Sequence, residues 1–139
     1  MKPKAPLIDT DIIIDITKGK NPNVLKKAQA YIAQYSRYAI SQITVAELAH
    51  GFYKREGTMQ SLRELLKQCC VIRLNRESAI LAGKIAARLE SAGQRIGFAD
   101  TLIAAIAIEN GGVIITANMK HFQRVAALGY SLTVENWRQ

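Results

Sequence analysis

The chain has 139 residues, a length typical of one domain, and 49% of them are hydrophobic, which excludes an intrinsically disordered protein. Nineteen Lys and Arg residues against eleven Asp and Glu residues give a net charge of +8, which attracts polyanions such as nucleic acids. Uncharged runs such as 101–108 and 110–119 are too short to span a bilayer, and the N-terminus does not read as a signal peptide, so we expect a cytoplasmic protein with no membrane partner.

Short apolar runs alternate with amphipathic segments along the chain, and no linker or repeat divides them, so we expect a single domain over residues 1–139. The expected strands lie at 6–9, 37–40, 70–74, 113–116 and 131–134. The expected helices run from Thr10 to Gly19 and then over 23–35, 42–55, 58–68, 76–93 and 98–110. This alternation predicts a three-layer α/β fold, in which a central, mostly parallel sheet is flanked by helices on both faces.

A few residues mark the ends of these elements. Thr10 and Ser41 are expected to cap the helices that follow the first two strands, and Gly19 is expected to end the first helix.

Cys69 and Cys70 are adjacent, so a disulfide between them would be strained. We therefore expect both cysteines to be reduced core residues, with an exposed redox pair as the alternative.

Polar residues at the carboxyl ends of the expected strands form the first group of candidates, because the functional crevice of a parallel sheet lies beyond those ends. Asp9 ends the first strand, within LIDTDIIID (7–15), where an acid among β-branched residues is locally unfavourable. Thr116 and Asn118 follow the strand VIIT. The sequence therefore places Asp9 and this later turn at the same edge of the sheet.

The other acids differ in how much they need a functional explanation. Asp11 lies in the first turn of a helix, where the helix dipole stabilises a negative charge by about 0.3–1 kcal/mol, so a structural role is sufficient for it. Glu47, taken alone, is explained as a solvated residue. Asp100 stands in the first turn of a helix that is apolar almost all round, and an acid in such a setting needs a partner.

Asp9, Glu47 and Asp100 would repel one another if they met at one edge of the sheet, at about 4 kcal/mol for each pair at about 4 Å and an effective dielectric constant near 20. No Lys or Arg in these segments is placed to neutralise them, whereas a divalent cation would do so. Carboxylates without a Cys or His pair at ligand spacing favour Mg²⁺ or Mn²⁺ over zinc. Because water on such an ion can attack a phosphodiester, the pattern predicts a metal-dependent nuclease.

Three segments in this order resemble the PIN-domain ribonucleases, and most closely the VapC-like toxins of toxin–antitoxin pairs. They are LIDTDIIIDI, SQITVAELAHG and IGFADTLIAAIAIENGGVIITANMKHF, and the resemblance runs from about residue 6 to 135. It implies a PIN-like fold, an endoribonuclease activity, and Asp9, Glu47 and Asp100 as the Mg²⁺-binding set. It also implies RNA as the substrate, a cognate antitoxin as partner and, in most members, a homodimer.

The resemblance extends to the residues around these acids. Thr116 and Asn118 fall on the T-x-N turn that lines the family pocket, and Thr10 and Asp11 are placed to contact the water shell of the metal. Many members carry a fourth acid where this chain has His121. This histidine would either weaken a second metal or contact phosphate directly, and a surface histidine beside a packed Phe122 explains it equally well.

Three other functions share part of this pattern. A response-regulator receiver needs an Asp at the tip of a middle strand, and CVIRLNRES has none. A haloacid-dehalogenase-like phosphatase would use Asp9 as nucleophile, but it normally has Thr or Val where this chain has Ile13, and it needs a cap domain that this length does not allow. A catalytically weak PIN fold that only binds RNA or dimerises stays open because of His121.

Overall fold

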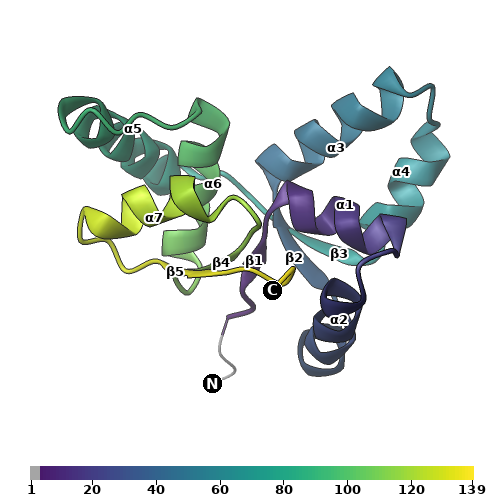
Figure 1. The fold of residues 1–139 in the computed structure, drawn as a ribbon. Helices are drawn as coiled ribbons and strands as arrows, with labels where there is room; N and C mark the ends of the chain where they lie inside the picture. Colours follow the sequence, from purple (N-terminus) through teal and green to yellow (C-terminus); the bar gives the residue numbers. More distant parts are fainter. Residues whose placement is uncertain (1–3) are drawn as a thin grey trace.

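The computed structural model describes residues 4–139 (Figure 1). The strands are β1 (Leu7–Ile8), β2 (Tyr38–Ser41), β3 (Cys69–Ile72), β4 (Val113–Ile115) and β5 (Thr133–Glu135). The helices are α1 (Thr10–Lys18), α2 (Pro22–Tyr35), α3 (Gln42–Lys54), α4 (Met59–Leu66), α5 (Arg76–Ser91), α6 (Phe98–Glu109) and α7 (Met119–Ala127). All strands and all helices but α7 lie close to the positions expected from the sequence.

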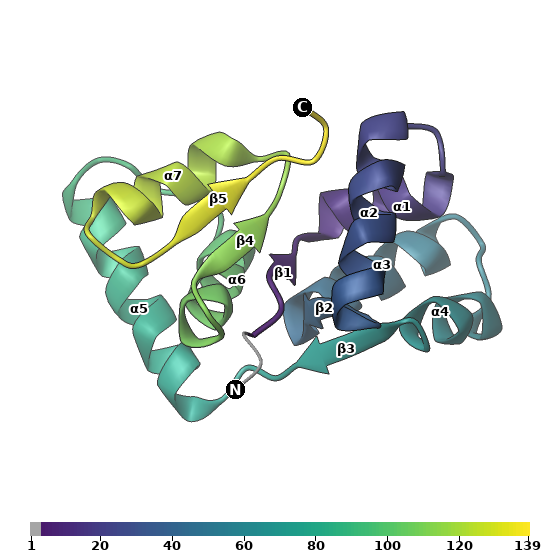
Figure 2. The same ribbon diagram turned by 90° about the horizontal axis from the view of Figure 1, so that it is seen from below.

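The strands pair in parallel, in the order β1-β4-β5 in one section of the sheet and β2-β3 in the other. β1 and β2 lie side by side where the two sections meet (Figures 1 and 2). Tyr31 of α2 bridges them, because its hydroxyl donates to the Pro6 carbonyl at 2.8 Å and accepts from the Ala39 N–H at 3.1 Å. A side-chain hydroxyl thus joins the two strands at this point.

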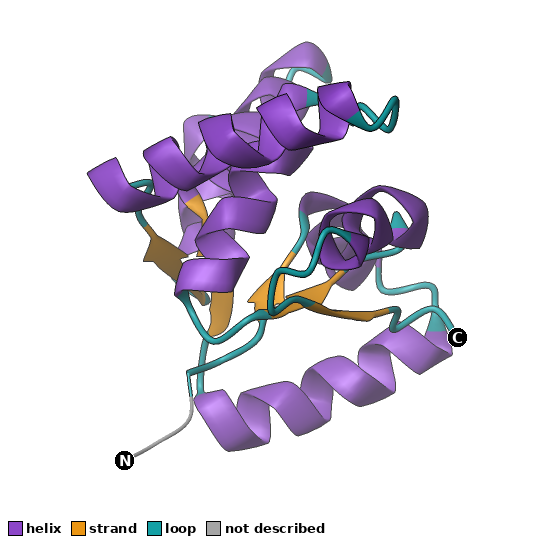
Figure 3. Cartoon of the chain, turned by 90° about the vertical axis from the view of Figure 1, so that its left-hand side faces the viewer, coloured by secondary structure: helices purple, strands orange, loops and turns teal. Residues whose placement is uncertain are grey.

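Helices cover both faces of the sheet, as expected for a three-layer α/β fold (Figure 3). Side chains alternate along each strand, so that Leu7 and Ile114 pack with α5, α6 and α7. Ile8 and Ile115 face the other way and pack with α1, α2, α3 and α4. The nearly uniform apolarity of α6 is explained by this arrangement, since its residues from Ile103 to Ala107 are fully buried.

The N-cap of α1 is Asp9, not Thr10 as the sequence suggested. Asp9 has extended backbone angles, φ −72° and ψ 160°, and its Oδ1 accepts a hydrogen bond from the Thr10 N–H at 2.8 Å. Thr10 is the first helical residue, so its hydroxyl is free for other contacts. The other two end signals are confirmed: Ser41 caps α3 by accepting from the Thr44 N–H at 3.0 Å, and Gly19 ends α1 with φ +65°.

Two further features differ from expectation. Helix α7 was not predicted, although its nine residues, MKHFQRVAA, make it as long as α1; Phe122 and Val125 anchor it in the core. Cys69 is a buried free thiol, as expected, but Cys70 is exposed. Neighbouring residues of a strand point to opposite faces, so two adjacent cysteines in β3 cannot enter the same core.

Within residues 4–139, no helix has the length and apolarity needed to cross a bilayer.

Candidate functional site

The candidate residues meet at the carboxyl edge of the sheet, where α3 and α6 lie on either side of the end of β1 (Figure 1). Asp9 follows β1 directly, and the turn from Thr116 to Asn118 follows β4. Glu47 belongs to α3, and Asp100 lies in the first turn of α6. Because β1 and β4 are parallel neighbours, their carboxyl ends bring Asp9 and Thr116 together.

Asp9 is only 5% exposed, and both of its carboxylate oxygens are held. Oδ1 accepts from the Thr10 N–H at 2.8 Å, and Oδ2 accepts from the Thr116 hydroxyl at 2.8 Å. Burial raises the pKa of Asp9 from 3.8 to about 7; repulsion from Asp11 and Asp100 acts in the same direction, and the hydrogen bonds from Thr116 and Thr10 oppose it. The site therefore holds a carboxyl group whose ionisation costs free energy.

Thr116 and Asn118 connect Asp9 to Asp100. The fully buried Thr116 hydroxyl donates to Asp9 and accepts from the Asn118 N–H at 2.9 Å. The Asn118 side-chain amide in turn donates to Asp100 Oδ2 at 3.2 Å. The T-x-N turn thus aligns two of the three candidate acids within one hydrogen-bond network.

His121 extends this network. Its Nδ1 lies 2.8 Å from Asp100 Oδ2 and 2.9 Å from Asn118 Nδ2. Since a carboxylate only accepts, we assign the Nδ1 proton to the bond with Asp100. The Nε2 atom then has no hydrogen-bond partner within residues 4–139, and the side chain is 36% exposed, so His121 contacts the site and also reaches its surface.

Glu47 joins the site through Thr10. The Thr10 hydroxyl donates to Glu47 Oε1 at 2.6 Å and also lies 3.0 Å from the Thr44 hydroxyl. Thr10 therefore touches two candidate acids at once, Asp9 through its N–H and Glu47 through its hydroxyl. Glu47 is otherwise exposed on α3.

Sequence reasoning identified the helical position of Asp11 but missed its second contact. Asp11 Oδ1 accepts from the Ile12 N–H at 2.8 Å, and Oδ2 accepts from the Ala117 N–H at 3.0 Å. Asp11 thereby fixes the position of Ala117, the middle residue of the T-x-N turn. Burial raises the pKa of Asp11, although the bonds from Ala117 and Ile12 oppose the shift. No local signal could reveal a contact between residues so far apart in sequence.

The carboxylate oxygens of the site are ligands that suit a hard divalent cation. In the described part of the chain, none of Asp9, Glu47 and Asp100 forms an ion pair with a Lys or Arg. Carboxylate oxygens are the ligands that Mg²⁺ and Mn²⁺ prefer, and of the three acids Asp9 is buried, Asp100 is half-buried and Glu47 is exposed. The three acids do not form a preformed cage, however: over residues 4–139, no three His, Cys, Asp or Glu side chains are grouped closely enough to hold a metal.

Comparison with known proteins identifies the family. The family model described as the PIN domain matches residues 7–128, which is most of the chain. The chain belongs to the PIN-domain family. This PIN domain is 34% identical over 125 residues to "Ribonuclease VapC1" of Haemophilus influenzae strain R2866, with 88% of this chain and 92% of the relative covered. It is 28% identical to the "tRNA(fMet)-specific endonuclease VapC" of Salmonella typhimurium strain LT2, with 94% and 96% covered.

Solved structures agree with this assignment. A VapBC2 complex from Rickettsia felis, bound to a DNA fragment from the promoter, matches this PIN domain with a TM-score of 0.78 at 26% identity, over 94% of this chain and 97% of the other. The VapBC-1 structure from nontypeable Haemophilus influenzae also gives 0.78, at 29% identity, over 96% and 98%. The expected PIN-like fold is therefore confirmed, and the receiver and phosphatase readings are excluded.

Proposed function

We propose that this PIN domain is a Mg²⁺-dependent endoribonuclease, with Mn²⁺ as an alternative ion, and the toxin of a toxin–antitoxin pair. The observation that carries the proposal is the buried Asp9, connected through Thr116 and Asn118 to Asp100, with no Lys or Arg of residues 4–139 paired to either acid. The relatives named as VapC ribonucleases, and the one named as a tRNA(fMet)-specific endonuclease, support RNA as the substrate.

Asp9 and Asp100 would hold the metal, with Glu47 contributing an oxygen directly or through water. A bound Mg²⁺ supplies an activated water and stabilises the charge that develops on the scissile phosphate. The protein's own part is positioning: Thr116 and the Thr10 N–H fix the orientation of Asp9, while Asn118 and His121 fix that of Asp100. Thr10 holds Glu47 next to these acids through its hydroxyl. Asp11 holds the T-x-N turn through the Ala117 N–H.

A cytoplasmic location, an antitoxin partner and a homodimer belong to the same proposal. The structural relatives are complexes named VapBC, which supports an antitoxin as partner. The antitoxin would be expected to cover the acidic edge, since blocking Asp9 and Asp100 is the direct way to silence this site. RNA would approach the same edge, so the antitoxin and RNA should compete.

The test is cleavage of a panel of single-stranded RNAs and tRNAs by purified protein, with Mg²⁺ and with EDTA, in the wild type and in Asp100→Asn. Glu109→Gln is a matched control, because it removes an exposed acid from the other end of the same helix. We expect cleavage by the wild type and by the control only with the metal, and none by Asp100→Asn. Cleavage that persists in EDTA or in Asp100→Asn would contradict the proposal.

A second function, RNA binding without cleavage, is favoured by two observations: Glu47 is exposed, and no group of three ligands is preassembled in the described residues. Under this alternative, no condition gives cleavage, and RNA binds equally well with Mg²⁺ and with EDTA. The cleavage test, together with a binding measurement on the same RNAs, therefore distinguishes the two functions.

A further inference from the structure

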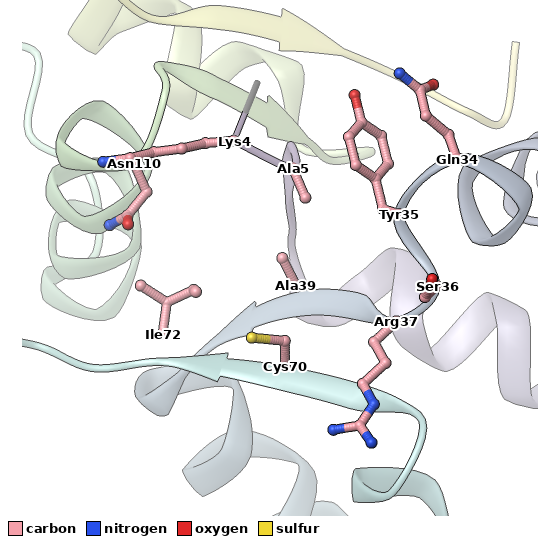
Figure 4. Close-up of a pocket in the computed structure, with 10 residues that line it drawn as sticks. All are labelled: Lys4, Ala5, Gln34, Tyr35, Ser36, Arg37, Ala39, Cys70, Ile72 and Asn110. Atoms are coloured by element: carbon pink, nitrogen blue, oxygen red, sulfur yellow. The ribbon is translucent and has the colours of Figure 1, made fainter. Parts of the chain in front are cut away.

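Two hollows of the molecule differ in the side chains that line them. One lies at the amino-terminal edge of the sheet and has a volume of about 600 Å³, with Cys70 and Ile72 among its lining residues and no Asp or Glu side chain from residues 4–139 (Figure 4). The other has a volume of about 340 Å³ and lies between the end of α5 and the start of α6. Glu90 and Arg95 both line this second hollow, so it presents a hydrogen-bond acceptor and a hydrogen-bond donor together.

The hollow between α5 and α6 adjoins the acidic site. Phe98, which lines the hollow, and Asp100 belong to the same first turn of α6. The segment that carries Arg95 is also tied to α7, because Arg124 Nη1 donates to the Arg95 carbonyl at 3.0 Å. One turn earlier on α7, His121 contacts Asp100. A single RNA strand with its scissile phosphate at the acids would therefore pass next to this hollow.

The apolar lining of the hollow suits a flat ring. Leu89 and Ile96 line it and are almost fully buried, so their positions are fixed by the core. Phe98 is exposed, which leaves its ring open to a partner. Unpaired bases of single-stranded RNA stack on aromatic side chains in this way and are then read along their hydrogen-bonding edges. A nucleobase thus matches the apolar part of the lining.

The polar part of the lining is an exposed ion pair. Arg95 Nη2 donates to Glu90 Oε1 at 3.0 Å, and Glu90 Oε2 has no hydrogen-bond partner within residues 4–139. A guanidinium has five N–H donors, so most of those of Arg95 are also free. Because an exposed ion pair adds little to folding stability, both side chains can exchange contacts with each other for contacts with a ligand.

The order of donor and acceptors in this pair selects among the four bases. Arg95 supplies donors and Glu90 supplies only acceptors, which is the order that cytosine presents on its pairing edge. Guanine carries the complementary order, with the O6 acceptor followed by the N1–H and N2–H donors. Adenine, cytosine and uracil each place at least one lone pair where guanine has a donor, so that lone pair would face the carboxylate of Glu90. Guanine is therefore the base that satisfies both side chains.

We propose that this hollow binds an unpaired guanine of the RNA substrate, next to the scissile phosphate. Phe98 stacks on the base, Arg95 donates to O6, and Glu90 accepts from N1–H and N2–H. The assignment rests on the proposed endoribonuclease function, because it names the base that the same site selects.

Binding in EDTA tests the base without cleavage. Labelled uridine oligomers that carry one central guanosine, inosine or adenosine, or no substitution, would be titrated by fluorescence anisotropy against Asp100→Asn protein. We expect the guanosine oligomer to bind about fivefold more tightly than the adenosine and all-uridine oligomers, the low end for one bidentate pair because the hollow is open to solvent. Inosine lacks the N2 amino group and should lie between them. Equal affinity for all four oligomers, or binding of none, would overturn the guanine subsite and leave the hollow to a protein partner.

Glu90→Gln, in the same background, separates recognition from charge. Removing a negative charge should slightly raise the affinity of a basic protein for every RNA, whereas loss of the carboxylate should lower the affinity for the guanosine oligomer to that for adenosine. Glu64→Gln is the matched control, because Glu64 is also an exposed acid that pairs with a basic residue, Lys67, at 3.0 Å. It should keep the preference for guanosine. The proposal would be wrong if Glu90→Gln kept that preference as well.

Cleavage by the wild type is measured separately, so the subsite and the nuclease can fail separately. A preference for guanosine in binding, with no cleavage of any RNA, would support the subsite and reject the proposed nuclease. Metal-dependent cleavage by a protein that binds all four oligomers equally would support the nuclease and reject the subsite.

Discussion

At the scale of single residues, Asp9 carries the largest electrostatic cost in the site. Its pKa rises from 3.8 to about 7 on folding, mainly because the carboxyl is buried and secondarily because Asp11 is close. A shift of this size corresponds to about 4 kcal/mol of free energy against the ionised form. Natural stability margins are only about 5–15 kcal/mol, so this cost is large on the scale of the whole protein, and the cation of the proposed function would offset it.

The first prediction follows from the sign of this shift. The folded pKa of Asp9 exceeds the unfolded value, so the unfolded state loses its proton first as pH rises, and the folded state loses stability between about pH 4 and 7. In metal-free buffer, Asp9→Asn should remove most of that loss, so the variant should exceed the wild type in unfolding free energy at pH 8 and match it near pH 4. Urea unfolding at both pH values measures this. If the unfolding free energy of Asp9→Asn depended on pH as that of the wild type does, this prediction would be wrong.

The same variant should also abolish cleavage.

His121 leads to a second prediction at this scale. Replacing it with Asp puts a fourth acid beside Asp100, where His121 Nδ1 now lies 2.8 Å from Oδ2. The added negative charge should strengthen Mg²⁺ binding by about tenfold, in the range seen for residues that contact metal ligands. It should also destabilise the metal-free protein by about 1 kcal/mol through repulsion at a partly exposed site. Titration calorimetry with Mg²⁺ and thermal unfolding in EDTA measure the two effects.

His121→Gln is the control for this experiment, because it keeps a polar contact with Asp100 but adds no charge. Equal Mg²⁺ affinity for the Asp and Gln variants would show that position 121 does not influence the metal, and His121 would then be a surface residue of α7 only.

At the scale of elements, α6 presents an unusual first residue. Phe98 is 64% exposed at the start of a helix whose central residues are fully buried, and it stands two positions before Asp100. An exposed aromatic ring beside an acidic site is suited to stacking on a base of single-stranded RNA. Arg95, also exposed, lines the same surface hollow.

Phe98→Ala is therefore expected to weaken binding of single-stranded RNA by about tenfold, since stacking on an aromatic side chain contributes about 1–3 kcal/mol per base. Fluorescence anisotropy with labelled RNA, in the Asp100→Asn background to prevent cleavage, measures this. Ile80→Ala is the matched control, because Ile80 is 61% exposed on α5 and has no aromatic ring. Similar losses in both variants would reject stacking.

The elements themselves were largely predictable, whereas their side-chain contacts were not. Alternating apolar runs located the strands, and the rule for parallel sheets correctly placed Asp9 and Thr116 at one edge. The contact of His121 with Asp100 spans 21 residues and that of Asp11 with Ala117 spans 106, so both depend on how the helices pack. The interruption of the sheet depends on a single hydroxyl of Tyr31, which no pattern of hydrophobicity encodes.

At the scale of the whole molecule, a net charge of +8 surrounds a site that is itself acidic. Under the proposed function, the two signs would serve different steps: the dispersed Lys and Arg residues would attract the phosphate backbone, and the acids would require a cation before a phosphate could approach closely. RNA affinity and metal affinity should therefore respond to different variables, with ionic strength controlling the first and the carboxylates controlling the second.

The last prediction tests this separation with Asp100→Asn protein, which should bind RNA without cutting it. For single strands, the logarithm of affinity falls with the logarithm of salt concentration with a slope of about −0.7 for each neutralised phosphate, so about five contacts predict a loss of roughly a hundredfold between 50 and 200 mM salt. Anisotropy titrations in EDTA measure the slope. Reversing a surface charge far from the acids, as in Lys84→Glu, should change RNA affinity but leave Mg²⁺ affinity unchanged. A flat salt dependence would mean that the basic surface does not bind the substrate, because released counterions are the only source of this slope.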